Sequence, residues 1–222
     1  MTKLQWDTAG TRLYETGVSN VVLYTQDTQG AYTKGVAWNG ITSISQNPTG
    51  ADANPIYADN IKYLDLRGAE EEEGSIEAYT YPDEWAICDG SAELVPGVMI
   101  HQQQRKPFGL CYKTILGNDT QLDAHGYKLH LIYGATASPS EKSYETVNDS
   151  PEAITFSWDY TTTPVAVKDA KPTASLEIDS TKFTTEAQKA KLTAFEEILY
   201  GGESTEARLP LPDEVKTLLA VE

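Results

Sequence analysis

The sequence has few of the residues with which enzymes most often do chemistry. Its 222 residues include three histidines and two cysteines, Cys88 and Cys111. Widely spaced cysteines without a metal-ligand pattern are expected to be buried, reduced thiols. No nucleophile elbow, phosphate-binding glycine loop, dinucleotide fingerprint or zinc-protease motif is present. We therefore expect neither an enzyme nor a cofactor, and no metal site at His125 and His130, which would project from different places.

Positive charge is also scarce. The chain has 17 Lys and Arg against 33 Asp and Glu, a formal net charge of −16. DNA-binding proteins gain affinity by releasing counterions through basic groups, and anionic membranes attract basic segments. The composition therefore argues against tight binding to either. Long apolar runs are missing too, since the longest, Leu94 to Ile100, is far shorter than the ~20 residues of a membrane-spanning helix.

Strand-like segments dominate what is present. Residues 18–24 are rich in β-branched side chains, and a turn at 27–30 followed by 35–45 predicts an early hairpin. Residues 127–133 and 154–160 alternate in hydrophobicity, which predicts strands with one buried face each. The side chains expected to face the core are Tyr127, Leu129, Leu131 and Tyr133 in the first segment, and Ile154, Phe156, Trp158 and Tyr160 in the second.

Shorter strands are expected at 76–80 and 174–178, and residues 119–123 are interpreted as a hairpin connection. The predicted fold class is therefore mainly β: an antiparallel β-sandwich or barrel with a flanking helix and a partly helical C-terminal segment. We expect one β-sandwich domain over residues 1–200 and an arm or short helix over 201–222.

Helical signals come late in the chain. Thr185 and Gln188 fit a capping box, an apolar stripe follows, and Gly201 supplies a stop. The stripe consists of Ala187, Ala190, Ala194, Phe195, Ile198 and Leu199. A second short helix is expected to begin at Pro212. A brief helix after Pro82 is expected to carry Trp85 inward.

Two segments, about 46–56 and 67–74, have the composition of long exposed loops, which are either functional or inert solvated excursions. The first contains Asn47, Pro48, Thr49, Gly50, Ala51, Asp52, Ala53, Asn54 and Pro55, and the second contains Glu70, Glu71, Glu72 and Glu73.

The order of elements from 36 to 90 resembles that of the major tail proteins, or tail tube proteins, of long-tailed, siphovirus-type bacteriophages. The most specific part is the first loop, then Tyr57-Ala58-Asp59-Asn60, an acidic turn, a strand, and Pro82-Asp83-Glu84-Trp85. Further similarity at 106–110, 116–119, 126–135, 138–140 and 150–164 extends the resemblance over most of the chain.

The resemblance implies a β-sandwich subunit that self-assembles into rings, commonly hexameric, which stack into the tube through which the genome leaves the capsid. It implies a place in the virion tail, after synthesis in the cytoplasm of a bacterial host. The implied partners are further copies of the chain and the tape measure, tail terminator and distal tail proteins. No cofactor and no membrane are implied.

The same resemblance suggests roles for three segments. Residues 47–55 are the candidate inter-ring loop, and Glu70 to Glu73 are candidates for an acidic lumen or ring edge, past which DNA slides without specific binding. The candidate contacts of a C-terminal arm are Leu209, Leu211, Val215, Leu218 and Leu219. This helix-bearing C-terminus departs from the family pattern. The alternative is a monomeric β-sandwich that binds carbohydrate or a receptor through exposed aromatic side chains, and an enzyme ranks third.

Overall fold

Strands make up most of the regular structure in the computed structural model, which describes residues 3–50, 52–147, 149 and 153–220. The strands are β1 (Leu13–Thr25), β2 (Gly35–Ala37), β3 (Ile41–Gly50), β4 (Ala53–Ala58), β5 (Ile61–Arg67), β6 (Glu70–Ala78), β7 (Ala92–Val95), β8 (Val98–Ile100), β9 (Phe108–Asn118), β10 (Leu122–Ala137), β11 (Phe156–Thr162) and β12 (Ser175–Asp179). The helices are the 3-10 turns η1 (Asp83–Trp85) and η2 (Ser180–Lys182), and α1 (Glu186–Tyr200) and α2 (Pro212–Leu219). The predicted mainly-β class with antiparallel sheets and late helices is confirmed.

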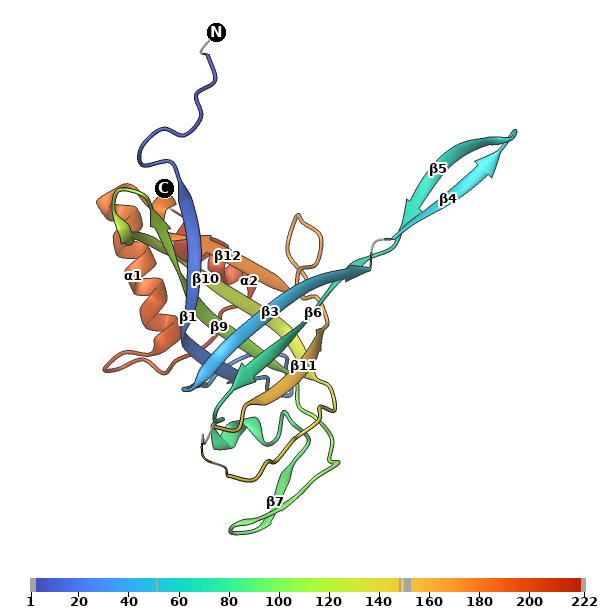
Figure 1. Cartoon of the computed structure of the whole chain (residues 1–222), viewed down its shortest axis with the longest axis vertical. Helices are drawn as coiled ribbons and strands as arrows, with labels where there is room; N and C mark the ends of the chain where they lie inside the picture. The colour runs from blue at the N-terminus through green and yellow to red at the C-terminus, as the bar shows by residue number, and fades with distance from the viewer. Residues whose placement is uncertain (1–2, 51, 148, 150–152, 221–222) are drawn as a thin grey trace.

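Eight strands form one sheet in the order β2-β1-β9-β10-β11-β6-β3, with β12 paired to β10. Strand β10 is shared, because residues 128–132 pair with β12 and residues 135–137 with β11. Between these stretches Gly134 has a φ of 61°, and a Cβ there would meet the Thr163 carbonyl, so the bend requires glycine. In Figure 1, β3, β6 and β11 cross in front of β1, β9 and β10. The sheet therefore folds over itself into two layers.

The first core fills the space between these two layers and is rich in aromatic rings. Trp85 is fully buried, and its ring centroid lies 4.6 Å from that of Trp38, 4.9 Å from Phe108 and 5.4 Å from Trp158. The 3-10 turn after Pro82 delivers Trp85 to this position, as predicted. Aromatic pairs in this range stabilise a core beyond the area that they bury.

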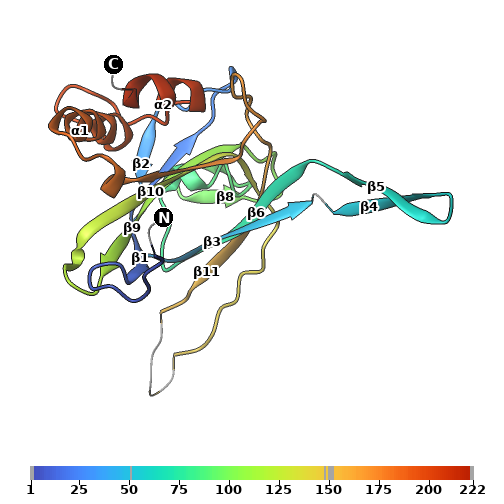
Figure 2. The same cartoon turned by 90° about the horizontal axis from the view of Figure 1, so that it is seen from above.

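The second core lies on the other side of β9 and β10, beneath α1 and α2. Leu129, Leu131 and Tyr133 of β10 point into it, whereas Ile132 between them points into the first core. The alternation predicted for residues 127–133 is confirmed, but the expectation of a single buried face is wrong because both sides of this strand are covered. Figure 2 shows the two helices together on one side of the sheet.

Three other local predictions are confirmed. Asp27 accepts hydrogen bonds from the amides of Gln29 and Ala31 in the turn of the early hairpin, whose strands are β1 and β2. The second strand of this hairpin is shorter than the predicted 35–45, because β3 begins at Ile41 and pairs with β6 instead. Residues 119–121 connect β9 to β10. The Thr185 hydroxyl accepts from the Gln188 amide, and the Gln188 side chain accepts from the Thr185 amide, which completes the capping box of α1.

Two local predictions need correction. Strand β11 begins at Phe156, so Ile154 lies outside it and is exposed rather than turned toward the core. On α1 the buried side chains are Leu192, Phe195 and Leu199. The apolar stripe therefore includes Leu192 and not the small alanines at 187, 190 and 194, because the larger side chain reaches the second core.

Both segments predicted as long loops are largely strand. Asn47 to Gly50 end β3, Ala53 to Pro55 begin β4, and Glu70 to Glu73 begin β6. Ala51 lies outside the described residues, and Asp52 joins the two strands. Proline is tolerated at Pro48 because β3 is an edge strand, whose outer side needs no backbone donor.

Candidate functional site

The first candidate surface is a two-stranded ribbon that projects from the body of the protein. Strands β4 and β5 pair only with each other, and the turn between them is Asp59-Asn60, both with positive φ. Figure 1 shows the ribbon extending well beyond the two-layered body, with its tip toward the end that carries the N-terminus. Every residue of β4 and β5 is exposed. Sequence reasoning placed exposed loops at about 46–56 and 67–74, on either side of most of the ribbon, and missed its regular structure.

The ribbon carries more apolar side chains than an exposed element normally does. Register pairs Ile56 with Leu64, and Leu66 lies two residues further along the same face. Tyr57, Ile61 and Tyr63 are each about two-thirds exposed (68%, 64% and 67%). An isolated two-stranded ribbon is at best marginally stable in water, and contiguous exposed apolar side chains mark interaction sites. The ribbon is therefore a candidate interaction surface.

The base of the ribbon is anchored to the first core. The Tyr160 hydroxyl on β11 donates to the Ser45 carbonyl on β3 at 3.0 Å, although β6 lies between these strands. The Tyr160 side chain passes beside Gly74 of β6, where a Cβ would collide with both the Tyr160 ring and the Ser45 carbonyl. A glycine at this position is therefore a packing requirement.

The second candidate surface is the outer face of β3, β6 and β11. Register places Ser43 beside Glu77, Ser45 beside Ser75 and Asn47 beside Glu73, and the same β6 residues lie beside residues of β11. The side chains of this polar face are Ser43, Ser45, Asn47, Thr49, Glu71, Glu73, Ser75, Glu77, Ser157, Asp159 and Thr161. The strand residues of this face include four carboxylates and no Lys, Arg or large apolar side chain. Sequence reasoning did not assign Glu77 and Asp159 to a site: alternation within β6 puts Glu77 on the side of Glu73, but only the pairing of β6 with β11 brings Asp159 to the same face.

The acidic run is divided between two sides of its strand. Glu71 and Glu73 alternate with Glu70 and Glu72, so only the first two share the polar face. Glu72 is turned toward the body, where it accepts hydrogen bonds from Ser175 Oγ at 2.5 Å and Gln46 Nε2 at 3.0 Å. Glu72 is thus structural, whereas Glu70, Glu71 and Glu73 are exposed.

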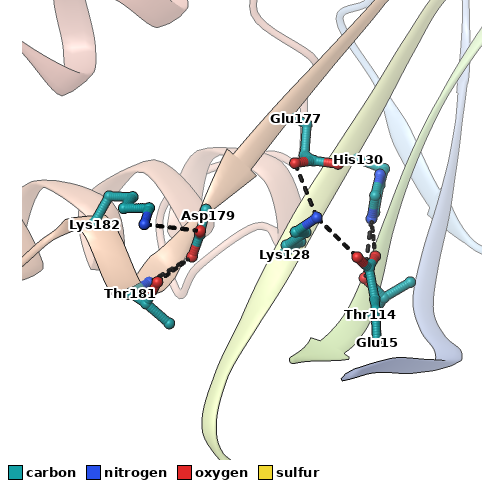
Figure 3. A network of polar contacts seen from close by, with 8 residues as sticks. All are labelled: Glu15, Thr114, Lys128, His130, Glu177, Asp179, Thr181 and Lys182. Atoms are coloured by element: carbon teal, nitrogen blue, oxygen red, sulfur yellow. Dashed lines mark hydrogen bonds and ion pairs between the residues drawn. The ribbon is translucent and has the colours of Figure 1, made fainter. Parts of the chain in front are cut away.

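A polar network ties together the opposite end of the sheet (Figure 3). Lys128 Nζ lies 2.8 Å from Glu15 Oε2 and 3.1 Å from Glu177 Oε1. His130 Nε2 lies 2.9 Å from Thr114 Oγ1 and 3.2 Å from Glu15 Oε1. Partial burial acts to raise the pKa of Glu15, but hydrogen bonds from Lys128 and Thr114 outweigh it, so the pKa is lowered. The network joins β1, β9, β10 and β12 and is structural.

The predicted C-terminal contacts lie mostly within the subunit itself. Leu209 and Val215 are buried in the second core, and Leu218 and Leu219 are partly buried against it. A free arm at Leu209 and Val215 is therefore a wrong prediction, since their side chains are needed to cover the sheet. Leu211 is exposed, and its contact with another subunit stays a prediction.

The described residues offer little for other chemistry. Among them, no three His, Cys, Asp or Glu side chains gather closely enough to hold a metal ion. Within the same ranges, the helices are all too short or too polar to cross a bilayer. Cys88 and Cys111 are buried and unpaired with each other, as predicted.

Comparison with known proteins gives only distant matches. No family model and no curated protein matches the chain. Among solved structures it is similar to a chain of the sheath–tube complex of an extracellular contractile injection system, PVC, in the extended state (12% identity, 72% of this chain and 88% of that chain, TM-score 0.33). It is also similar to the tube terminating cap of the anti-feeding prophage (12%, 81% and 96%, TM-score 0.33) and to the PVC sheath/tube terminator (12%, 79% and 99%, TM-score 0.30).

None of these matches establishes a family. At such low identity and TM-score, the function has to be inferred from the chain's own surfaces.

Proposed function

We propose that the chain is a structural subunit of a phage-type tail tube, which assembles with further copies into stacked hexameric rings that form the conduit for genome delivery. The observation that carries the proposal is the ribbon of β4 and β5, whose apolar side chains have no partner within the described chain. A subunit that functions alone would expose this surface to aggregation. In a stacked tube, a neighbouring ring covers it.

The polar face supports a lumen-lining role for the opposite side of the subunit. It carries Glu73, Glu77 and Asp159, with hydroxyl and amide side chains between them. Such a surface repels phosphate and offers no apolar patch to which bases can stick, so DNA passes without being held. The helices cover the other side of the two-layered body, which leaves this face free to line a channel.

The proposal includes partners beyond the chain itself. Both ends of a tube made from one subunit expose unsatisfied stacking surfaces, so terminator and distal tail proteins are expected to cap them. A tape measure protein is expected inside the channel before DNA enters. These partners place the protein in the tail of a virion made in bacterial cytoplasm.

Negative-stain electron microscopy of the concentrated protein tests the proposal. Rings or tubes with a central hole are expected. The informative variant replaces residues 51–69 with a two-residue Asn-Gly turn that joins Gly50 to Glu70, whose strands are already paired there. This variant should fold but form no tubes. A matched control, Lys62→Gln, removes an exposed ion pair with Asp65 and should assemble normally. Tubes of normal length from the shortened variant would refute a role for the ribbon.

A monomeric binding module is the second candidate, and the exposed Tyr57 and Tyr63 of the ribbon favour it. Exposed aromatic rings can stack on sugars. Tyr133, Trp158 and Tyr160 are buried and unavailable for this purpose. This candidate predicts a monomer at all concentrations, with saturable ligand binding that Tyr57→Ala and Tyr63→Ala abolish.

A further inference from the structure

Two further apolar surfaces lie at opposite ends of the molecule's longest axis. Figure 1, in which this axis is vertical, shows the N-terminal segment at one end and the hairpin of β7 and β8 at the other. The hairpin strands pair only with each other, and their residues are exposed apart from the half-buried Ala92. The large apolar side chains of the hairpin are Leu94, Val95, Val98, Met99 and Ile100, which are 37% to 64% exposed.

The N-terminal end has a matching apolar character. Leu4 and Trp6 are 72% and 76% exposed. The Gly10 amide donates to Asp119 at 2.9 Å, which holds this segment beside the β9–β10 turn. Leu13 and Leu122 are also exposed there, and both are paired with Asn118. The two ends are therefore similar in chemistry but different in shape.

The apolar area of the two ends suits a specific contact between them. If a fully exposed large apolar side chain offers about 150 Å², these nine side chains present on the order of 800 Å² of apolar surface. A specific interface buries ~1,200–2,000 Å² in total, of which somewhat over half is apolar. Lys3 and Arg12 at the N-terminal end face Asp7, Asp119 and Asp123, a net charge of −1, and Glu93 is the only charged residue of the hairpin. Both surfaces therefore carry little net charge, and the contact between them depends on their apolar side chains.

We infer that the β7–β8 hairpin is the docking surface for the N-terminal end of a second copy of this chain, in a head-to-tail contact. Because the two surfaces differ, the contact is heterologous and repeats along the axis, as stacked rings require. The inference rests on the proposed tube assembly and names a stacking contact separate from the ribbon. It assigns to residues 92–100 a role that their sequence did not suggest.

Disulfide cross-linking between two differently tagged copies tests the contact. One copy carries Trp6→Cys and the other Val98→Cys, and the native Cys88 and Cys111 remain in place because they are buried. We expect a cross-linked heterodimer to form readily on mild oxidation. The control pairs Trp6→Cys with Ala190→Cys on the exposed side of α1, and it should cross-link at least tenfold less. Equal cross-linking of the two pairs, or none from either, overturns the inference.

Charged variants give a second, independent measurement. Val98→Asp with Met99→Asp, and separately Leu4→Asp with Trp6→Asp, should leave the circular dichroism spectrum unchanged because all four side chains are exposed. Each should lower stacking about tenfold or more in sedimentation, as expected for charge at the centre of an apolar contact. Normal stacking by the charged hairpin variant, together with loss of tubes on shortening the ribbon, would overturn this inference and leave the proposed function standing. Wild-type protein that remains monomeric, together with no cross-linking between the Trp6→Cys and Val98→Cys copies, would contradict both.

Discussion

Lys128 reaches across a whole strand to Glu15: its Nζ lies 2.8 Å from Glu15 Oε2, although β1 and β10 each pair with β9 and not with one another. Thr114 of β9 lies beneath this bridge and donates to the same carboxylate at 2.6 Å. The pair therefore holds three neighbouring strands in register.

The first prediction concerns acid stability. The pKa of Glu15 is lowered from its ordinary value of 4.5 in the folded protein. Its contribution to stability is therefore present above pH 4.5 and is lost as the pH falls through the lower, folded value. Glu15→Gln should lower the free energy of unfolding by about 1 kcal/mol at neutral pH and flatten its acid dependence. Urea denaturation over a pH series measures both, and Glu203→Gln, in an exposed loop, should reproduce the wild-type curve.

The second prediction concerns the aromatic core. Trp85→Ala removes a ring that contacts Trp38, Phe108 and Trp158, and it should cost about 3–5 kcal/mol in unfolding free energy. Tyr144→Ala, at a side chain that is 70% exposed, should change it by less than about 0.5 kcal/mol. Chemical denaturation compares the two, and similar costs would contradict the packing described.

The third prediction concerns the start of α1. Thr185→Ala removes the hydroxyl that caps the Gln188 amide and should destabilise the protein by about 1 kcal/mol. Thr184→Ala is a close control, because only the backbone amide of Thr184 bonds to Gln188. Equal losses in thermal unfolding would show that the cap contributes nothing specific.

The fourth prediction concerns the thiols. Burial raises the pKa of Cys88 and of Cys111 to about 12, so almost no thiolate exists near pH 8 and neither sulfur is accessible. A thiol reagent should react with neither cysteine in the folded protein and with both in urea. Rapid reaction of the native protein would contradict the burial of these side chains.

The fifth prediction concerns the polar face. Glu73→Lys with Asp159→Lys reverses two charges on adjacent strands of this face. The variant should retain DNA in a manner that weakens steeply with salt, because lysines release counterions from phosphate. Glu186→Lys on α1 gives one reversed charge on a helix that covers the opposite side of the body and should retain much less. DNA co-sedimentation at two salt concentrations makes the comparison, and no difference between the variants would count against a lumen-facing role.

Local sequence patterns predicted an element correctly where contacts within one segment determine its structure. The alternation of residues 127–133 predicted strand β10, and Thr185 with Gln188 predicted the start of α1. The same patterns failed where contacts with distant parts of the chain determine whether a segment becomes a strand. Asn47 to Pro55 have the composition of a turn. An exposed edge strand nevertheless accepts proline and asparagine, because its outer backbone groups need no partner strand and its side chains need not pack in a core.

The candidate surfaces were harder to predict because they depend on pairing between distant segments. Glu73 and Asp159 share a face only because β6 and β11 are neighbours. Leu209 and Val215 seemed available for other subunits, but the second core they cover is made of β10 residues some eighty positions earlier in the chain. No periodicity within either segment carries that information.

The hydrogen bond from Tyr160 to Ser45, made possible by Gly74, ties β11 to β3 across β6, the two strands that lead into the ribbon being β3 and β6. In the proposed assembly, strands that are already ordered in the subunit lose less conformational freedom on docking than a flexible arm would. A side chain at position 74, which would collide with Tyr160 and the Ser45 carbonyl, is therefore expected to weaken assembly as well as packing.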